Sequence, residues 1–168
     1  MANTIGNVLV GVAELFIGVA GAGAAVSVGY TEDGVTLEYG ADVADIEVEE
    51  ETFPINRVLT KETITVICNC AESSIANIGY GIAGADGAVT PVIIGKVAGG
   101  GVLQTCSLKV VGTNPAGFDR TIVIAYAHPT GTVGMAYKKG EKTVVPMSFV
   151  AYKGATAVDV CTITDAAA

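Results

Sequence analysis

Most of the chain alternates between apolar and polar residues over short runs that Gly-rich turns separate. Such runs, rich in Val, Ile, Thr and Tyr, are typical of β-strands that bury one face. The pattern predicts an all-β protein of two packed antiparallel sheets, in a sandwich-like or barrel-like arrangement. The expected strands cover residues 7–17, 34–40, 43–51, 61–71, 103–111, 120–127, 132–138, 142–152 and 157–164.

One segment departs from this period and predicts a short helix within residues 71–82. Ile75, Ile78 and Ile82 recur at helical spacing, and one of the two serines at 73 and 74 can cap the first turn. Its glycines weaken the helix, so we expect it to lie on the sheets and to depend on that packing.

Proline and glycine add detail to this outline. Pro146 falls inside the expected strand 142–152, which should therefore lie at a sheet edge or carry a bulge there. Residues 84–101 are rich in glycine and predict a loose loop that carries one short strand. With no internal repeat and no linker, residues 1–168 are expected to form one domain with an N-terminal arm at about residues 1–6.

An acidic run between residues 42 and 51 is the most informative local feature. Alternate positions carry carboxylates, so one face of the expected strand 43–51 presents a row of them about 6.6 Å apart; the row is Asp45, Glu47, Glu49 and Glu51. Ala44, Ile46 and Val48 are expected to face the core. Like charges in a row repel, so a water-filled channel or a basic partner surface would suit it. A solvated strand face without a function is the alternative.

Charge is distributed unevenly along the 168 residues. The first 56 residues hold ten acidic residues and no Lys or Arg, whereas the rest hold seven acidic and nine basic residues, and the net charge is −8. Nucleic-acid binding normally needs clustered cations, and the tight basic group is Lys138, Lys139 and Lys142. Sequence-specific nucleic-acid binding is therefore not expected. The same three lysines are a candidate basic partner surface for the acidic row of a neighbouring copy.

The apolar stretch from Ile5 to Tyr30 has some features of a signal peptide or a membrane helix. However, no basic segment precedes it, Glu14 interrupts it, and the uncharged run that follows is short and dominated by Gly and Ala. We therefore expect synthesis in the cytoplasm and no membrane insertion. A hydrophobic fraction of 51% with 15% charged residues also excludes a mainly disordered chain.

The sequence shows no motif for catalysis or cofactor binding. The single histidine, His128, precedes a proline and is interpreted as a turn residue at a strand end, not as a general base. The glycines at 18, 21 and 23 lack the spacing of a dinucleotide-binding loop. We therefore expect no enzyme activity and no cofactor.

The four cysteines are spread over several expected strands. Cys68 and Cys70 lie two residues apart, so they share one strand face, whereas Cys106 and Cys161 lie on other expected strands. This spacing fits zinc poorly, and no metal is expected. Most of the weight falls on buried thiols that pack as small apolar groups. The sharper hypothesis is that some of the four form crosslinks between subunits outside the reducing cytosol.

The order of these features resembles the tail tube proteins of tailed bacteriophages. The resemblance rests on residues 28–31, 33–39, the acidic strand that follows, 54–62 and 71–78, and residues 137–149 fit the penultimate strand hairpin of that family. It spans about residues 7–164, and residues 84–102 match nothing in the family pattern.

The resemblance implies subunits joined in hexameric rings, which stack into a hollow tube in the virion tail for delivery of the genome. It also implies that the connection near residues 49–60 reaches an adjacent ring; its candidate contacts are Glu50, Phe53, Pro54, Asn56 and Arg57. The implied partners are further copies of the chain, tape-measure, tail terminator and baseplate proteins, a sheath if the tail is contractile, and viral DNA as passing cargo.

Three other interpretations stay open from the sequence. The same fold serves the inner tubes of phage-derived contractile injection particles and bacteriocins. A capsid decoration or head-completion protein would also be an acidic β-domain. A small binding domain such as an adhesin would be a monomer with a secretion signal, which is not evident here.

Overall fold

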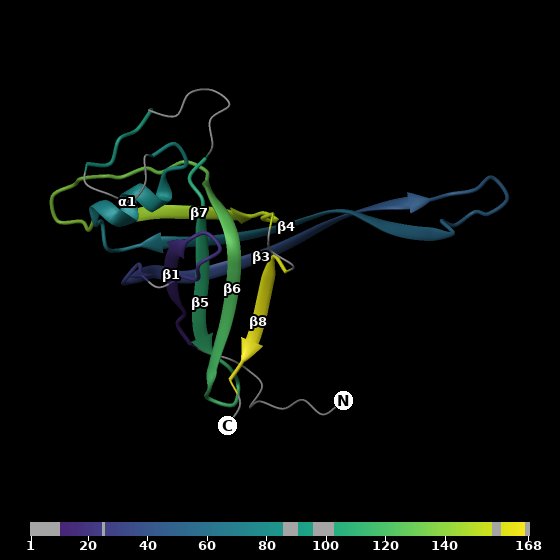
Figure 1. Cartoon of the computed structure of the whole chain (residues 1–168), viewed down its shortest axis with the longest axis horizontal. Coiled ribbons are helices and arrows are strands. Elements are labelled where there is room, and N and C mark those ends of the chain that lie inside the picture. Colours follow the sequence, from purple (N-terminus) through teal and green to yellow (C-terminus); the bar gives the residue numbers. More distant parts are fainter. Residues whose placement is uncertain (1–10, 25, 86–90, 96–102, 156–158, 167–168) are drawn as a thin grey trace.

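The computed structural model describes residues 11–24, 26–85, 91–95, 103–155 and 159–166. Within these ranges the chain forms eight strands and one short helix (Figure 1). In chain order they are β1 (Glu14–Val19), β2 (Val26–Ser27), β3 (Thr31–Ile46), β4 (Asn56–Cys70), α1 (Ile75–Gly81), β5 (Cys106–Thr113), β6 (Asp119–Thr130), β7 (Val145–Ala151) and β8 (Cys161–Asp165).

The strands form one antiparallel sheet that is folded into two layers. Its hydrogen-bonded order is β2-β1-β5-β6-β7-β4-β3, and β8 pairs with β6. In Figure 1, strands β7, β4 and β3 run crosswise to β1, β5, β6 and β8. The two layers are joined where β6 residues 127–130 pair with β7 residues 148–151. The all-β antiparallel fold with one short helix, expected from the sequence, is thus confirmed.

Both layers contribute to one hydrophobic core. Leu15 and Ile17 of β1 and Leu108 of β5 meet Val66 of β4 and Phe149 of β7, and each of these side chains is almost fully buried. The alternation of buried and partly buried positions along β7 is the pattern that its sequence predicts. Burial of each such side chain contributes about 1.5–3 kcal/mol, so this core stabilises the body of the molecule.

Helix α1 is shorter than the sequence pattern indicated. Ser74 caps it by accepting a hydrogen bond from the Asn77 backbone N–H, as one of the two predicted serines should. Ile78 packs against the core, but Ile75, expected on the same face, is half exposed. The buried helical positions are instead Asn77, Gly79 and Gly81.

A buried polar cluster fixes α1 to the sheet. The Asn77 Nδ2 lies 2.9 Å from the backbone oxygens of both Val28 and Glu72 and 3.2 Å from the Cys70 Sγ. The Cys70 thiol lies 3.2 Å and 3.3 Å from the same two oxygens, to which it can donate. The carbonyl groups of Val28 and Glu72, which follow β2 and β4, thereby gain hydrogen-bond donors inside the protein.

Strands β3 and β4 are much longer than expected. The sequence predicted separate strands at 34–40 and 43–51 with a turn near Gly40, but Gly40 pairs with Thr63 inside one continuous ladder. A bulge lies near the start of β3 instead, where Asp33 and Gly34 adopt positive φ values of 63° and 78°. Such values favour glycine, and Asp tolerates them better than most residues.

Two further strand predictions differ from the structure. Residues 132–138 do not form a strand. Strand β7 is not at a sheet edge, because β6 and β4 flank it; Pro146 pairs with β4, while β6 pairing begins only at Ser148. At Pro146, β7 therefore pairs with β4 but not with β6, which suits a residue that has no N–H to donate. The expected N-terminal arm and most of the Gly-rich loop 84–101 lie outside the described residues, within which Ala85 and Ile94 form an isolated bridge.

Within the described residues, none of the helical structure has the length and apolar character needed to cross a bilayer.

Candidate assembly site

A two-stranded hairpin extends far from the body of the molecule (Figure 1). Pairing between β7 and β4 ends at Thr65, and from there to the turn β4 pairs with β3 alone. We call residues 39–46 and 56–64 the hairpin shaft and residues 47–55 the hairpin tip. No described residue of the shaft or tip is classed as buried. A two-stranded hairpin without a third strand or a covering layer is marginally stable in water.

Cross-strand contacts organise the shaft. The Arg57 Nε lies 2.8 Å from the Asp45 Oδ1, and the Tyr39 hydroxyl donates to the Glu62 carboxylate at 2.8 Å. The second contact, a hydrogen bond to an anion, raises the pKa of Tyr39. A bulge places Thr60 outside the pairing, and its hydroxyl donates to the Asp42 backbone oxygen at 3.0 Å. The shaft thus has a defined register and twist.

The hairpin tip carries most of the acidic row, which corrects the sequence-based prediction. The expected strand 43–51 ends at Ile46, and the carboxylates at 47, 49, 50 and 51 lie in the connection between β3 and β4. Ala44, Ile46 and Val48, expected to face the core, are exposed, because the hairpin extends beyond the core. Of the four predicted members of the row, Asp45 remains on the strand and pairs with Arg57.

The predicted inter-ring contacts gather at the same end. Glu50, Phe53 and Pro54 lie in the tip, and Asn56 and Arg57 begin β4. The tip is closed by a hydrogen bond from the Ile55 N–H to the Ile46 oxygen at 2.9 Å. Phe53 is among the most exposed large apolar side chains of the described chain. The tip therefore combines four carboxylates with an exposed aromatic ring.

The predicted basic surface lies at the opposite end of the molecule. Residues 137–142, the basic loop, belong to the connection between β6 and β7, which Figure 1 places far from the hairpin tip along the longest axis. The Lys138 Nζ lies 3.2 Å from Glu141, and the Lys142 Nζ lies 3.0 Å from Glu32. Lys139 and the neighbouring Tyr137 are exposed. Since exposed ion pairs are weak, these lysines remain available to a stronger anionic partner.

The structure distributes the four cysteines over the core and its border. Cys68, Cys70 and Cys106 are buried free thiols, and Cys161 on β8 is partly exposed. Burial raises the pKa of the Cys68 and Cys106 thiols to about 12, with the neighbouring Cys70 adding to the effect at Cys68. A thiolate is the reactive species, so the buried thiols are poor candidates for crosslinks and Cys161 is the accessible one.

A groove beside β1 and the single histidine are two further places where a small molecule could bind. A groove of about 610 Å³ beside β1 is lined by three carboxylates, Glu14, Glu72 and Asp119, among mainly apolar residues. His128 lies inside β6 and not in a turn, as had been predicted; its ring stacks on Tyr152 at 4.2 Å, and its Nδ1 lies 3.0 Å from the Gln104 backbone oxygen. Across the described ranges, no cluster of three or more His, Cys, Asp or Glu residues could hold a metal ion.

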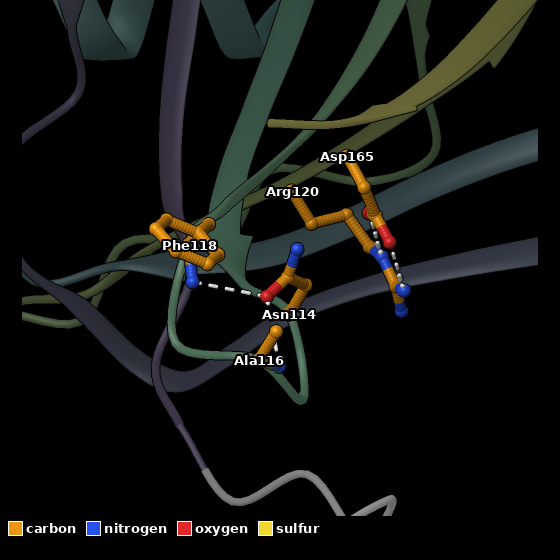
Figure 2. A network of polar contacts seen from close by, with 5 residues as sticks. All are labelled: Asn114, Ala116, Phe118, Arg120 and Asp165. Atoms are coloured by element: carbon orange, nitrogen blue, oxygen red, sulfur yellow. Dashed lines mark hydrogen bonds and ion pairs between the residues drawn. The ribbon is translucent and has the colours of Figure 1, made fainter. Parts of the chain in front are cut away.

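Polar contacts at the far end of β6 fix β8 and a tight turn (Figure 2). The Asn114 side chain accepts hydrogen bonds from the N–H groups of Ala116 and Phe118, at 3.0 and 2.9 Å. Arg120 and Asp165 form two parallel hydrogen bonds of 2.6 and 2.8 Å, which lower the pKa of Asp165. The asparagine before Pro115 is a turn signal in the sequence, but the Arg120–Asp165 pair depends on strand register and could not be predicted.

The sequence reasoning missed the apolar side chains on the shaft. Val43, Leu59 and Val58 are exposed there, although a β-branched or apolar residue in a strand normally indicates a core position. A signal for them is present, because apolar residues occupy both odd and even positions near residues 43–48 and 58–59. That pattern indicates a ribbon with two apolar faces.

Comparison with known proteins agrees with this fold. No family model matches the chain, and no curated protein matches its sequence. Among solved structures, a chain of the extended sheath–tube complex of PVC, an extracellular contractile injection system, matches with a TM-score of 0.57 and 8% identity, and the match covers 92% of this chain and 89% of the other. A chain of the anti-feeding prophage cap, which terminates a tube, matches with a TM-score of 0.54 and 11% identity over 90% and 88% of the two chains. The chain therefore has a tail-tube-like fold, and the expected resemblance is confirmed at the level of the fold.

Proposed function

We propose that the protein is a structural subunit that polymerises as stacked rings, six subunits to a ring, to form the hollow tube of a phage tail. The observation that carries the proposal is the protruding hairpin, whose exposed apolar and acidic residues have no covering layer within the chain. The likeness to a sheath–tube complex and a tube cap over nearly the whole chain supports it. In this role the chain serves as a conduit wall for the genome and carries out no chemistry.

The opposite charges at the two ends of the molecule provide a way to stack. The hairpin tip carries four carboxylates, and none of them forms an ion pair with a cation among the described residues; the basic loop lies at the other end. A contact between two different surfaces extends a filament wherever its rotation does not close a ring, so the tip of one copy on the basic loop of the next can add ring upon ring. The acidic row could otherwise line the lumen and repel DNA phosphates, but its place at a protruding tip favours the stacking contact.

The inner tube of a contractile injection particle is the second candidate function. The two structural neighbours come from an extracellular contractile injection system and an anti-feeding prophage, which favours this alternative. Such a tube would assemble in the same way. A sheath, a tape-measure protein, a terminator and a baseplate are the partners that either role would require.

Electron microscopy of the purified protein tests the proposal. At increasing concentration, negative-stain images should show rings or hollow rods, and size-exclusion chromatography should show a matching high-mass species. A protein that remains a monomer or trimer at all concentrations would contradict the tube and favour a capsid decoration or head-completion role. If a tube forms, the lumen alternative is tested by replacing Asp45, Glu47 and Glu49 with the matching amides and measuring genome ejection from particles of unchanged length.

A further inference from the structure

We infer that the hairpin shaft is inserted between copies of this chain, so that both of its broad faces are covered in the assembled state. The inference rests on the proposed function and adds to it how the hairpin engages its neighbours. The alternative is a hairpin laid flat on one surface, with its other face left in water.

The strand register divides the shaft side chains between two faces. Paired residues lie on the same face, and successive residues alternate. Val43 is opposite Leu59, and Ala44 is opposite Val58. The bulge leaves Thr60 without a paired residue, and the pairing passes from Lys61 directly to Leu59. Paired residues therefore share a face on both sides of the bulge. The first face therefore carries Val43 and Leu59, and the second carries Ala44, Val58 and Ile46.

Both faces expose apolar area to a similar degree. On the first face, Val43 is 57% and Leu59 is 50% exposed. On the second face, Val58 is 46% and Ile46 is 42% exposed. A hairpin that binds one surface and leaves the other in water normally alternates apolar and polar residues, because a polar outer face costs nothing in solution. Apolar pairs on both faces indicate that both are removed from water.

The charged groups of the shaft are arranged for such burial. On the first face, the Asp45–Arg57 ion pair and the Tyr39–Glu62 hydrogen bond flank the apolar pair. On the second face, Asp42 is opposite Lys61. Since each of these carboxylates has a neighbour that can compensate it, the shaft can be covered with fewer isolated charges than the hairpin tip.

The occupant that the charges favour is another copy of the chain. The tip is acidic and the basic loop lies at the opposite end of the same molecule, so identical copies are complementary along this axis. A tip that contacts the basic loop of a neighbouring copy would bring the shaft alongside the subunits around that contact. Those subunits offer exposed apolar residues of their own, among them Tyr30 and Val12.

Matched variants on the two faces test the inference. One variant carries Val43→Thr and Leu59→Thr, and the other carries Ile46→Thr and Val58→Thr; threonine keeps the preference for strands and removes apolar area. Each pair should raise the protein concentration needed for assembly by about tenfold or more, since two apolar contacts are weakened. The melting temperature of the unassembled subunit serves as the control, because neither pair touches the core. If one pair assembles like the unmodified chain, the shaft is covered on one face only and the inference is wrong.

Thiol labelling gives a second measurement that does not depend on assembly strength. Val43→Cys and Val58→Cys, each made together with Cys161→Ser, place one accessible thiol on either face. Maleimide labelling of both should slow by about tenfold between the unassembled and the assembled protein, since labelling requires access to the thiol. Slowing at one position alone would contradict the inference. If the unmodified protein forms no assembly at all, the proposed function itself fails, which is a different outcome.

Discussion

Arg57 and Asp45 face each other across the hairpin shaft, with the Arg57 Nε 2.8 Å from the Asp45 Oδ1, in a part of the molecule that has no core. The guanidinium group is largely exposed, so the pair contributes little to the subunit itself. In the proposed assembly, the pair would lie beside the surface through which the hairpin tip contacts a neighbouring copy.

The first prediction concerns this pair. Arg57→Ala should change the free energy of unfolding of the unassembled subunit by no more than about 1 kcal/mol, as for other exposed ion pairs. Assembly should weaken much more, because Asp45 is then left to be covered without a partner. Thermal unfolding and sedimentation velocity measure the two effects. The exchange Asp45→Arg with Arg57→Asp should recover assembly, and equal weakening by the single and exchanged variants would contradict this view.

The second prediction concerns the opposite charges at the two ends. Replacing the four tip glutamates at 47, 49, 50 and 51 with glutamine should slow assembly and reduce its dependence on salt, because the attraction to the basic loop is lost. Light scattering at several salt concentrations measures both changes. Glu38→Gln, an exposed change on β3 outside the tip, is the control. Reversal of the basic loop with Lys138→Glu and Lys139→Glu should produce the same defect; unchanged kinetics in both variants would rule out the contact.

The third prediction concerns the thiols. In the folded protein, Cys161 should react with a disulfide reagent well before Cys68, Cys70 and Cys106, which should become reactive only on unfolding. The pKa values of Cys68 and Cys106 are raised to about 12 from a usual value of 9.0. Burial of the neutral thiols therefore stabilises the fold fully below pH 9, and this contribution is lost as the pH rises from about 9 towards 12. Cys106→Ala removes one of these two thiols, so the free energy of unfolding should fall less between neutral pH and pH 12 in this variant than in the unmodified protein. Circular dichroism during alkaline unfolding measures the two changes. Equal labelling rates for all four thiols would contradict the assignment.

The fourth prediction concerns Asn77. Its replacement by alanine should lower the free energy of unfolding by about 1–3 kcal/mol, since the carbonyl oxygens of Val28 and Glu72 lose a buried donor. Chemical denaturation measures the loss. Ile75→Ala on the exposed side of the same helix is the control and should cost much less. A cost as large for Ile75→Ala would show that α1 packs differently.

The sequence allowed prediction of those features that depend on the core. Alternating residues such as Val145, Met147 and Phe149 identify strands because burial forces every second side chain inward. Ser74 identifies the start of α1 because an N-cap is a local interaction. These rules hold where a strand or helix lies on a core formed by the same chain.

The same rules failed at the hairpin, where the core is missing. Ile46 and Val48 were assigned to the interior because they are apolar and alternate with carboxylates, but no interior reaches that far. In the proposed assembly these residues are buried by another copy of the chain, and the pattern of a single sequence does not reveal such a contact. The length of β3 was missed for a related reason, since Gly40 indicates a turn until its pairing with Thr63 is known.

Strand β3 links the two ends of the molecule. It begins at Thr31, next to the Glu32 that pairs with Lys142 of the basic loop, and ends at Ile46, where the hairpin tip starts. Its 16 residues cover about 53 Å at the usual rise of a strand. In the proposed stack, tension applied to one tip would pass along the backbone hydrogen bonds between β3 and β4 to the basic loop, which would contact the tip of the next subunit. The long strand would then carry the mechanical load between stacked subunits. The sequences of the surrounding loops could change without weakening that connection.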